Sequence, residues 1–254
     1  MLLFGRTAEL GESMFATGWK KIVFAIWLLL WPLLLAMHLY PIRIAALRLG
    51  LLLVVFLIWL GILLLCWNRK PIRWTWLLIS FIFVMGCLWP RRTYNSQILR
   101  QEYIHSLQSY KGVTYVWGGE TKRGIDCSGL MRCGLVDADL KRGIATFNPS
   151  LLRAGFSLWW NDCSALALKQ EFQNRTRLLF TSASINAIDA AKMKPGDIAV
   201  TSNGVHVLAY IGHKTWIEAD PNEGVGHQVI EVQIPSRNVW FNTPVHVMRW
   251  RQLE

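Results

Sequence analysis

Three long apolar runs occupy the first third of this 254-residue chain and limit what it can fold into. They cover residues 22–40, 49–67 and 74–89. The first two have the roughly 20 residues that a bilayer-spanning helix requires, and the third lies at the lower limit. None shows a polar face, and tryptophans lie at their ends, as in the aromatic belt of a membrane interface. The sequence therefore predicts three transmembrane helices within residues 1–92, with the lipid bilayer as a partner.

A cleaved signal peptide is the competing interpretation of the first run. Its apolar part is long for such a peptide, and residues 36–38 (AMH) make a poor cleavage site. We therefore favour a retained helix.

The charges of the chain are distributed unevenly. Residues 1–92 hold ten Lys and Arg against two Asp and Glu, whereas residues 93–254 hold 17 against 14. A nucleic-acid-binding protein would carry its basic patch on the folded domain, so we expect no nucleic-acid partner. Six basic residues flank the runs on the side of the N-terminus and four on the other side. This mild bias predicts that the N-terminus is inside and that residues 93–254 lie outside.

Residues 93–254 have the pattern of a separate α+β domain. Leu99, Tyr103 and Leu107 recur every four residues, which predicts an amphipathic helix beginning at Ser96. Five later runs are short and rich in Val, Ile and aromatic residues: 197–201, 205–211, 215–219, 228–234 and 245–250. Helices followed by a meander of strands are typical of helices packed on an antiparallel sheet.

One polar stretch has the pattern of a nucleophile site. A Gly118-Gly119 turn is followed by Asp126, Cys127 and Ser128, after which an apolar helical pattern begins. Cys127 is therefore expected in the first turn of a helix, where exposed amides and the helix dipole favour a thiolate.

A nucleophilic cysteine needs a base, and the base needs a polar group that orients it. His206 is the best of five candidates because it opens an apolar strand directly after a Gly-containing turn; the others are His105, His213, His227 and His246. Glu218 follows on the next expected strand, where antiparallel pairing can bring it beside His206. Asp220 is the alternative third residue. A structural histidine and a solvent-facing glutamate remain the other interpretation of this pair.

Four segments resemble the NlpC/P60 family of cysteine peptidases in order and wording. They are residues 115–119 (YVWGG), 124–130 (GIDCSGL), 194–198 (KPGDI) and 206–212 (HVLAYIG). The resemblance covers roughly residues 95–250. It implies a papain-like α+β fold with Cys127 as nucleophile, His206 as base and Glu218 as third residue. It also implies that Tyr115 lies beside the nucleophile and helps to hold the oxyanion. We add Asp126 and Ser128 as candidates for oxyanion or substrate binding.

The activity implied by this resemblance is hydrolysis of bacterial peptidoglycan stem peptides, between D-glutamate and the diamino acid. The chain would then be a multi-pass protein of the bacterial inner membrane with residues 93–254 on the periplasmic side. Glu at the third position is more usual in CHAP amidases, so an N-acetylmuramoyl-alanine amidase is an alternative. A membrane-lipid acyltransferase and a non-catalytic wall-binding module are the others.

Three further features bear on these expectations. The separation of Cys127 from His206 is longer than the family leads us to expect, and the surplus lies within residues 143–190. Trp159 and Trp160 in this insertion either reshape the substrate groove or, as we prefer, cap the core. Of five cysteines none forms a CxxC pair, so no metal or cofactor is expected. Cys133 and Cys163 either pair or stay as buried thiols.

Overall fold

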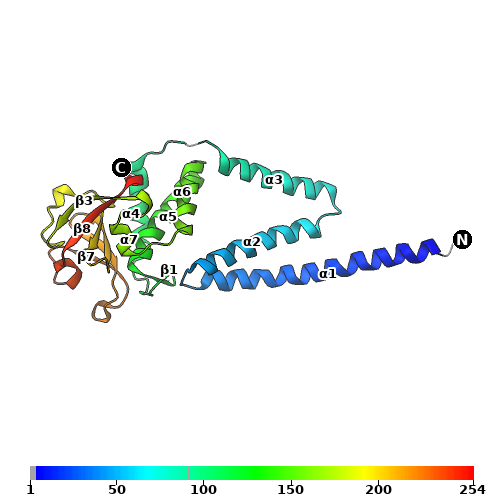
Figure 1. The fold of residues 1–254 in the computed structure, drawn as a ribbon, viewed down its shortest axis with the longest axis horizontal. Helices are drawn as coiled ribbons and strands as arrows, with labels where there is room; N and C mark the ends of the chain where they lie inside the picture. The colour runs from blue at the N-terminus through cyan, green and yellow to red at the C-terminus, as the bar shows by residue number, and fades with distance from the viewer. Residues whose placement is uncertain (1–3, 91) are drawn as a thin grey trace. The chain divides into compact units, whose positions relative to one another are not determined.

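A computed structural model describes residues 4–90 and 92–254 of the chain, and for residues 4–17 and Val225 it describes the backbone only. The described chain divides into two compact units, coloured by residue number in Figure 1. One unit holds the chain up to Leu39 together with Ala46–Gly86, and the other holds Tyr40–Ala45 and Cys87–Glu254.

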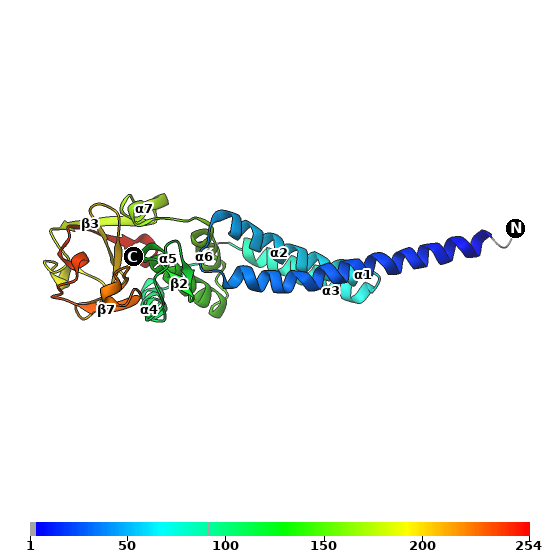
Figure 2. The ribbon, with the colours of Figure 1, turned by 90° about the horizontal axis from the view of Figure 1, so that it is seen from below.

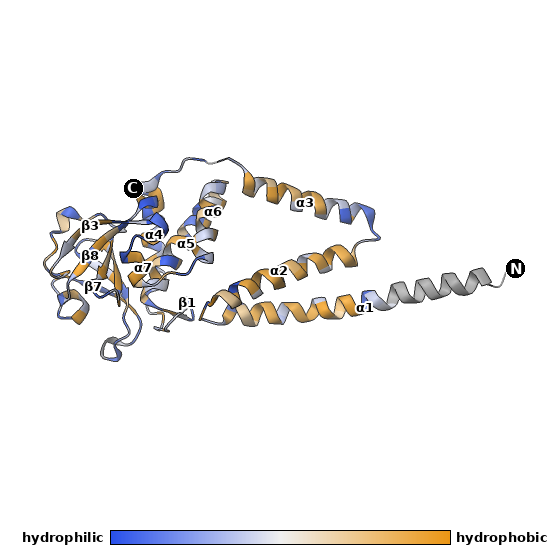
Figure 3. Ribbon diagram, in the orientation of Figure 1, coloured by the Kyte–Doolittle hydropathy of each residue, from blue (hydrophilic) through white to orange (hydrophobic). Residues whose placement is uncertain are grey.

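The first unit consists of three helices: α1 (Phe4–Leu39), α2 (Ala45–Leu65) and α3 (Lys70–Leu88). Each contains a segment long and apolar enough to cross a membrane, and these segments are Gly18–Leu39, Ala45–Leu65 and Lys70–Leu88. The residues of these segments are mostly hydrophobic (Figure 3), as the sequence predicted. Helix α1 begins well before its apolar run.

The second unit is built on a six-stranded antiparallel sheet with the strand order β3-β8-β4-β5-β6-β7. Its strands are β3 (Thr176–Ser182), β4 (Ile198–Thr201), β5 (Val207–Gly212), β6 (Thr215–Ala219), β7 (Val229–Gln233) and β8 (Val245–Trp250). A two-stranded ribbon, β1 (Glu120–Thr121) with β2 (Gly124–Ile125), lies before the central helix. The five strands expected from the sequence are present within two residues of their predicted ends.

Helices form the second layer of this domain. They are α4 (Ser96–Gln108), α5 (Cys127–Ala145), α6 (Pro149–Trp160) and α7 (Ala165–Lys169), and Figures 1 and 2 show them beside the sheet. Leu99, Tyr103 and Leu107 of α4 are fully buried in the core, where α5 contributes Leu130 and Met131. The α+β fold class predicted from the sequence is confirmed.

Residues 143–190 form α6, α7 and the edge strand β3. Trp159 packs against the main core, while Trp160 is 40% exposed. Helix α7 lies against the turn before β5. The two are so close that a Cβ on Gly204 would come within 2.7 Å of the Leu166 side chain. Lys169 also donates to the carbonyl of Ser202 in the same turn, at 2.6 Å.

The segment Tyr40–Ala45, which joins α1 to α2, belongs to the second unit. Ile42 forms a β-bridge with Gly119, and the amide of Arg43 donates to the carbonyl of Gly118 at 3.3 Å. The amide of Glu120 donates to the carbonyl of Pro41 at 2.9 Å. The segment is therefore held by backbone hydrogen bonds against the turn that precedes α5.

Candidate active site

Cys127 is the first residue of α5, and Asp126 caps that helix. One oxygen of Asp126 accepts from the amide of Gly129 at 2.5 Å and from the Ser128 hydroxyl at 3.0 Å. The other oxygen accepts from the amide of Gly118 at 2.8 Å. One carboxylate thus fixes both the helix start and the preceding turn. The amides of Cys127 and Ser128 are in the first turn, where an α-helix provides no acceptor.

Close packing of backbone holds the nucleophile loop against α5. A Cβ on Gly129 would lie 2.4 Å from the carbonyl oxygen of Gly119, so only glycine fits there. The same carbonyl accepts from the amide of Asp126 at 3.1 Å. Further along α5, buried Arg132 forms ion pairs with Glu120 of β1 and with Asp162. The position of the Cys127 backbone is therefore set from both sides.

His206 directly precedes β5 and is 1% exposed. The Thr201 hydroxyl oxygen accepts from the amides of Val205 and His206 at 3.2 and 3.0 Å. Gly204, with φ +74°, closes the turn by donating its amide to the carbonyl of Thr201 at 2.7 Å. The turn brings Val205 beside the nucleophile, and the Cys127 sulfur lies 3.9 Å from the Val205 carbonyl.

The three residues singled out from the sequence lie together in the structure. The Nε2 atom of His206 is 2.6 Å from Oε2 of Glu218, and both side chains are buried. The Cys127 side chain lies close enough to the same imidazole to raise its pKa. Because Ala209 pairs with Ile217 across β5 and β6, Glu218 lies diagonally across from position 206 and can reach it.

Asn238 and Trp240, which the sequence analysis missed, complete the surroundings of the imidazole. Asn238 Nδ2 donates to Oε1 of Glu218 at 3.1 Å and to Asp220 at 2.8 Å, so it bridges two buried carboxylates. The Trp240 ring stacks on His206 with centroids 4.2 Å apart and an interplanar angle of 20°. Asp220, the alternative third residue, accepts this hydrogen bond from Asn238 and a second one, at 3.3 Å, from the Trp240 indole. Asn238 caps a short 3-10 helix that contains Trp240, and so short a helix has no periodic sequence pattern that would have pointed to them.

Tyr115 lies beside the nucleophile. Burial, followed by the charges of Cys127, Asp126 and Asp220, raises the pKa of the Tyr115 hydroxyl, which therefore keeps its proton at neutral pH. The Tyr115 ring meets His227 edge-on at 5.2 Å, and His227 Nδ1 is 2.7 Å from the carbonyl oxygen of Pro221. Because it keeps its proton, the Tyr115 hydroxyl can donate a hydrogen bond.

Cys133 and Cys163 are separate buried thiols. Burial raises the pKa of both Cys133 and Cys163, in the second case to about 11. Neither is a thiolate at neutral pH.

The charge on His206 is set by its neighbours. Burial lowers the pKa of the imidazole, but the hydrogen bonds and charges of Cys127 and Glu218 outweigh it and raise the pKa to about 9. Burial raises the pKa of Glu218, while His206 lowers it and Asp220 raises it. His206 is therefore protonated at neutral pH and can give up a proton in this site.

We expect the stability of the domain to fall between pH 6.5 and pH 9.5. A pKa raised on folding contributes stability that is complete below the unfolded value, 6.5, and is lost as the pH rises through the folded value, about 9. Thermal unfolding of the full chain in detergent, followed by tryptophan fluorescence, measures this. Asp139, whose pKa burial raises to about 8, changes stability in the same sense. The difference between wild type and His206→Gln removes that background, and a pH-independent difference would contradict the assignment.

Known proteins are similar to the part of the chain that contains these residues. A model of the NlpC/P60 family matches residues 112–244, more than half of the chain. The probable endopeptidase NlpC of Escherichia coli K12 is 27% identical over 140 residues, which cover 53% of this chain and 70% of that protein.

Two solved structures are also similar. NlpC1 from Trichomonas vaginalis is 18% identical with a TM-score of 0.40, and the match covers 64% of this chain and 47% of that one. An NlpC/P60 family protein from Bacillus cereus is 14% identical with a TM-score of 0.38, and covers 63% and 41% respectively. The chain spans about half of the length of these proteins or less. With its family model matched across Cys127, His206 and Glu218, the chain belongs to the NlpC/P60 family of cysteine peptidases.

Proposed function

We propose that the chain is a membrane-anchored cysteine endopeptidase that hydrolyses peptidoglycan stem peptides between D-glutamate and the diamino acid. The observation that carries the proposal is the buried His206, which lies 2.6 Å from Glu218 and close enough to Cys127 for that side chain to raise its pKa. Family membership supplies the class of reaction. The substrate comes from what members of this family most often cleave.

In the proposed reaction Cys127 attacks as the thiolate and His206 begins as the imidazolium. The sulfur adds to the scissile carbonyl and forms a tetrahedral intermediate. As that intermediate collapses, the C–N bond breaks and His206 donates its proton to the leaving amine. The neutral imidazole then takes a proton from water, which attacks the thioester and releases the acid. Glu218 orients the ring and stabilises its charged form.

The remaining site residues receive supporting roles in this proposal. The amides at the start of α5, where Cys127 lies, and the Tyr115 hydroxyl stabilise the oxyanion. Asp126 is an acceptor whose two oxygens bind Gly118, Ser128 and Gly129. It and Ser128 therefore act by holding the nucleophile loop in place.

The proposed location is the bacterial inner membrane, with the catalytic domain outside. Two spans, α2 and α3, separate the α1–α2 connection from the catalytic domain, so in this topology both lie on the same side of the membrane. The hydrogen bonds between Tyr40–Ala45 and the turn before α5 agree with this. The distribution of Lys and Arg then favours the outside for that shared side.

Glu218 gives one reason to keep the N-acetylmuramoyl-alanine amidase as a second candidate, since that chemistry uses the same fold and a Glu at this position. Digestion of purified peptidoglycan by the full chain in detergent separates the two, because each cut gives products of different mass. We expect released fragments that begin with the diamino acid. Stem peptides released whole from muramic acid would identify the amidase, and an intact polymer would refute both.

A further inference from the structure

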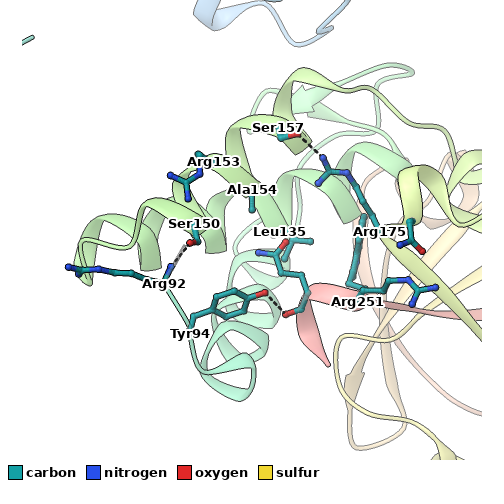
Figure 4. A pocket seen from close by; sticks show the side chains of 12 residues that line it. Arg92, Tyr94, Leu135, Ser150, Arg153, Ala154, Ser157, Arg175 and Arg251 are labelled. Carbon is teal, nitrogen blue, oxygen red and sulfur yellow. Dashed lines mark hydrogen bonds between the residues drawn. The ribbon is translucent and has the colours of Figure 1, made fainter. Parts of the chain in front are cut away.

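A basic pocket lies on the catalytic domain away from Cys127. It has a volume of about 600 Å³, and its lining includes Arg92, Arg153, Arg175 and Arg251 but no Asp or Glu among the described residues. Figure 4 shows Arg175 and Arg251 on one side and Arg92 and Arg153 on the other. The floor is apolar and includes Leu135 and Trp250, both buried.

The hydrogen bonds of these arginines leave most of their charge uncompensated. Arg175 donates to the Ser157 hydroxyl at 2.8 Å, and Arg153 donates to the carbonyls of Cys87 and Trp89. These acceptors are neutral. Arg251 lies 3.8 Å from Glu171, but both side chains are more than a third exposed, so that pair is weak.

The buried carboxyl group next to the pocket does not cancel this charge at neutral pH. Asp139 accepts a hydrogen bond from Gln252 of the pocket lining. Its Oδ2 atom is buried without a hydrogen-bond partner among the described residues, which suits a protonated acid. Burial raises the pKa of Asp139 to about 8, against the lowering effects of Gln252 and Arg175. An anion in the pocket therefore meets arginines and a neutral acid.

The chain itself fixes how far this pocket can be from the membrane. Arg92 follows Leu88, the last residue of α3, by four residues. A fully extended chain covers at most about 14 Å in that distance. The end of the third span thus keeps the pocket within reach of the headgroup layer, whatever the arrangement of the two units.

We propose that this pocket binds the phosphate of an anionic phospholipid headgroup from the leaflet in which α3 ends. Guanidinium groups bind phosphate through paired hydrogen bonds, and the apolar floor accommodates the glycerol part. The proposal rests on the membrane anchoring proposed above but not on the peptidase activity, and its test uses no turnover.

Native mass spectrometry of the full chain, taken from nanodiscs with equal phosphatidylglycerol and phosphatidylcholine, measures the lipid retained. We expect preferential retention of phosphatidylglycerol. The double variant Arg175→Gln/Arg251→Gln should lower that preference about 30-fold, in line with the attraction of anionic lipid for two basic groups. The control Arg123→Gln/Arg177→Gln removes the same charge outside the pocket and should leave the preference unchanged.

The single variant Arg251→Gln loses only the weak pair with Glu171, so it folds, and we expect it to lower the preference about fivefold. Equal retention of the two lipids by wild type, or equal losses in pocket and control variants, would overturn the proposal. Displacement of the lipid by 10 mM inorganic phosphate would point to a soluble anion instead. Displacement by a soluble stem peptide would assign the pocket to the substrate; either displacement would refute the lipid.

Discussion

Replacing Cys127 with alanine is expected to abolish the release of stem-peptide fragments while leaving the domain folded. The nucleophile of a catalytic triad contributes on the order of 10⁶-fold to kcat, so residual hydrolysis should fall below detection. Cys127 is a small side chain at a helix start, and removing its sulfur leaves the Asp126 cap intact. The measurement is fragment release from purified peptidoglycan, quantified by mass spectrometry for the full chain in detergent.

Cys133→Ala is the matched control for this variant. Cys133 also lies on α5 and is buried, but burial raises the pKa of its thiol and its sulfur lies 3.4 Å from the carbonyl of Glu120. We expect this variant to keep its activity. A thiol-directed probe at neutral pH should label Cys127 in wild type, and the peptide that contains position 127 should stay unlabelled in Cys127→Ala. Unchanged fragment release from Cys127→Ala would rule out the thioester mechanism.

Replacing Glu218 with alanine is expected to lower kcat/KM by about 10³-fold or more. The change leaves the Nε2 atom of His206 without its acceptor in a buried site and removes one of the two acceptors of the Asn238 amide. Loss of the carboxylate behind the base costs about 10⁴-fold in serine-protease triads. The initial rate of cleavage of a synthetic stem peptide measures this.

Glu218→Gln separates orientation from charge. Its amide oxygen can still accept from Nε2, but it carries no charge, so the pKa of His206 should fall below the value of about 9. We therefore expect a smaller loss of activity than in Glu218→Ala, with the alkaline limb of the pH profile at lower pH. Glu223→Gln on an exposed 3-10 helix should match wild type. A pH profile identical to wild type in Glu218→Gln would show that the carboxylate does not govern the base.

Much of the fold follows from short-range pattern. Strands β4 to β8 are short runs rich in Val, Ile and aromatic residues, and α4 repeats its apolar residues with helical spacing. Strand β3 gave no such signal because buried and exposed residues do not alternate along it. It has exposed Leu178 and a register shift between Leu178 and Phe180.

The candidate site was only partly predictable for a different reason. Cys127 and His206 stand in local contexts, a capped helix start and a Gly-containing turn, that sequence alone makes visible. Trp240 stacks on the imidazole and Asn238 bonds Glu218, and both lie at a 3-10 helix more than 30 residues after His206, so their positions depend on tertiary packing. The same holds for the four arginines of the basic pocket, which come from four separate parts of the chain.

The short connection between α1 and α2 contributes backbone hydrogen bonds to the catalytic domain. Pro41 and Arg43 bond the backbone on both sides of Gly119, whose carbonyl in turn holds Asp126. A soluble fragment that starts at residue 93 would lack these partners, and an unrelated membrane helix could not replace them. If the three helices anchor the chain as proposed, proteolytic release of residues 93–254 from the membrane would leave the turn before Cys127 without these backbone partners.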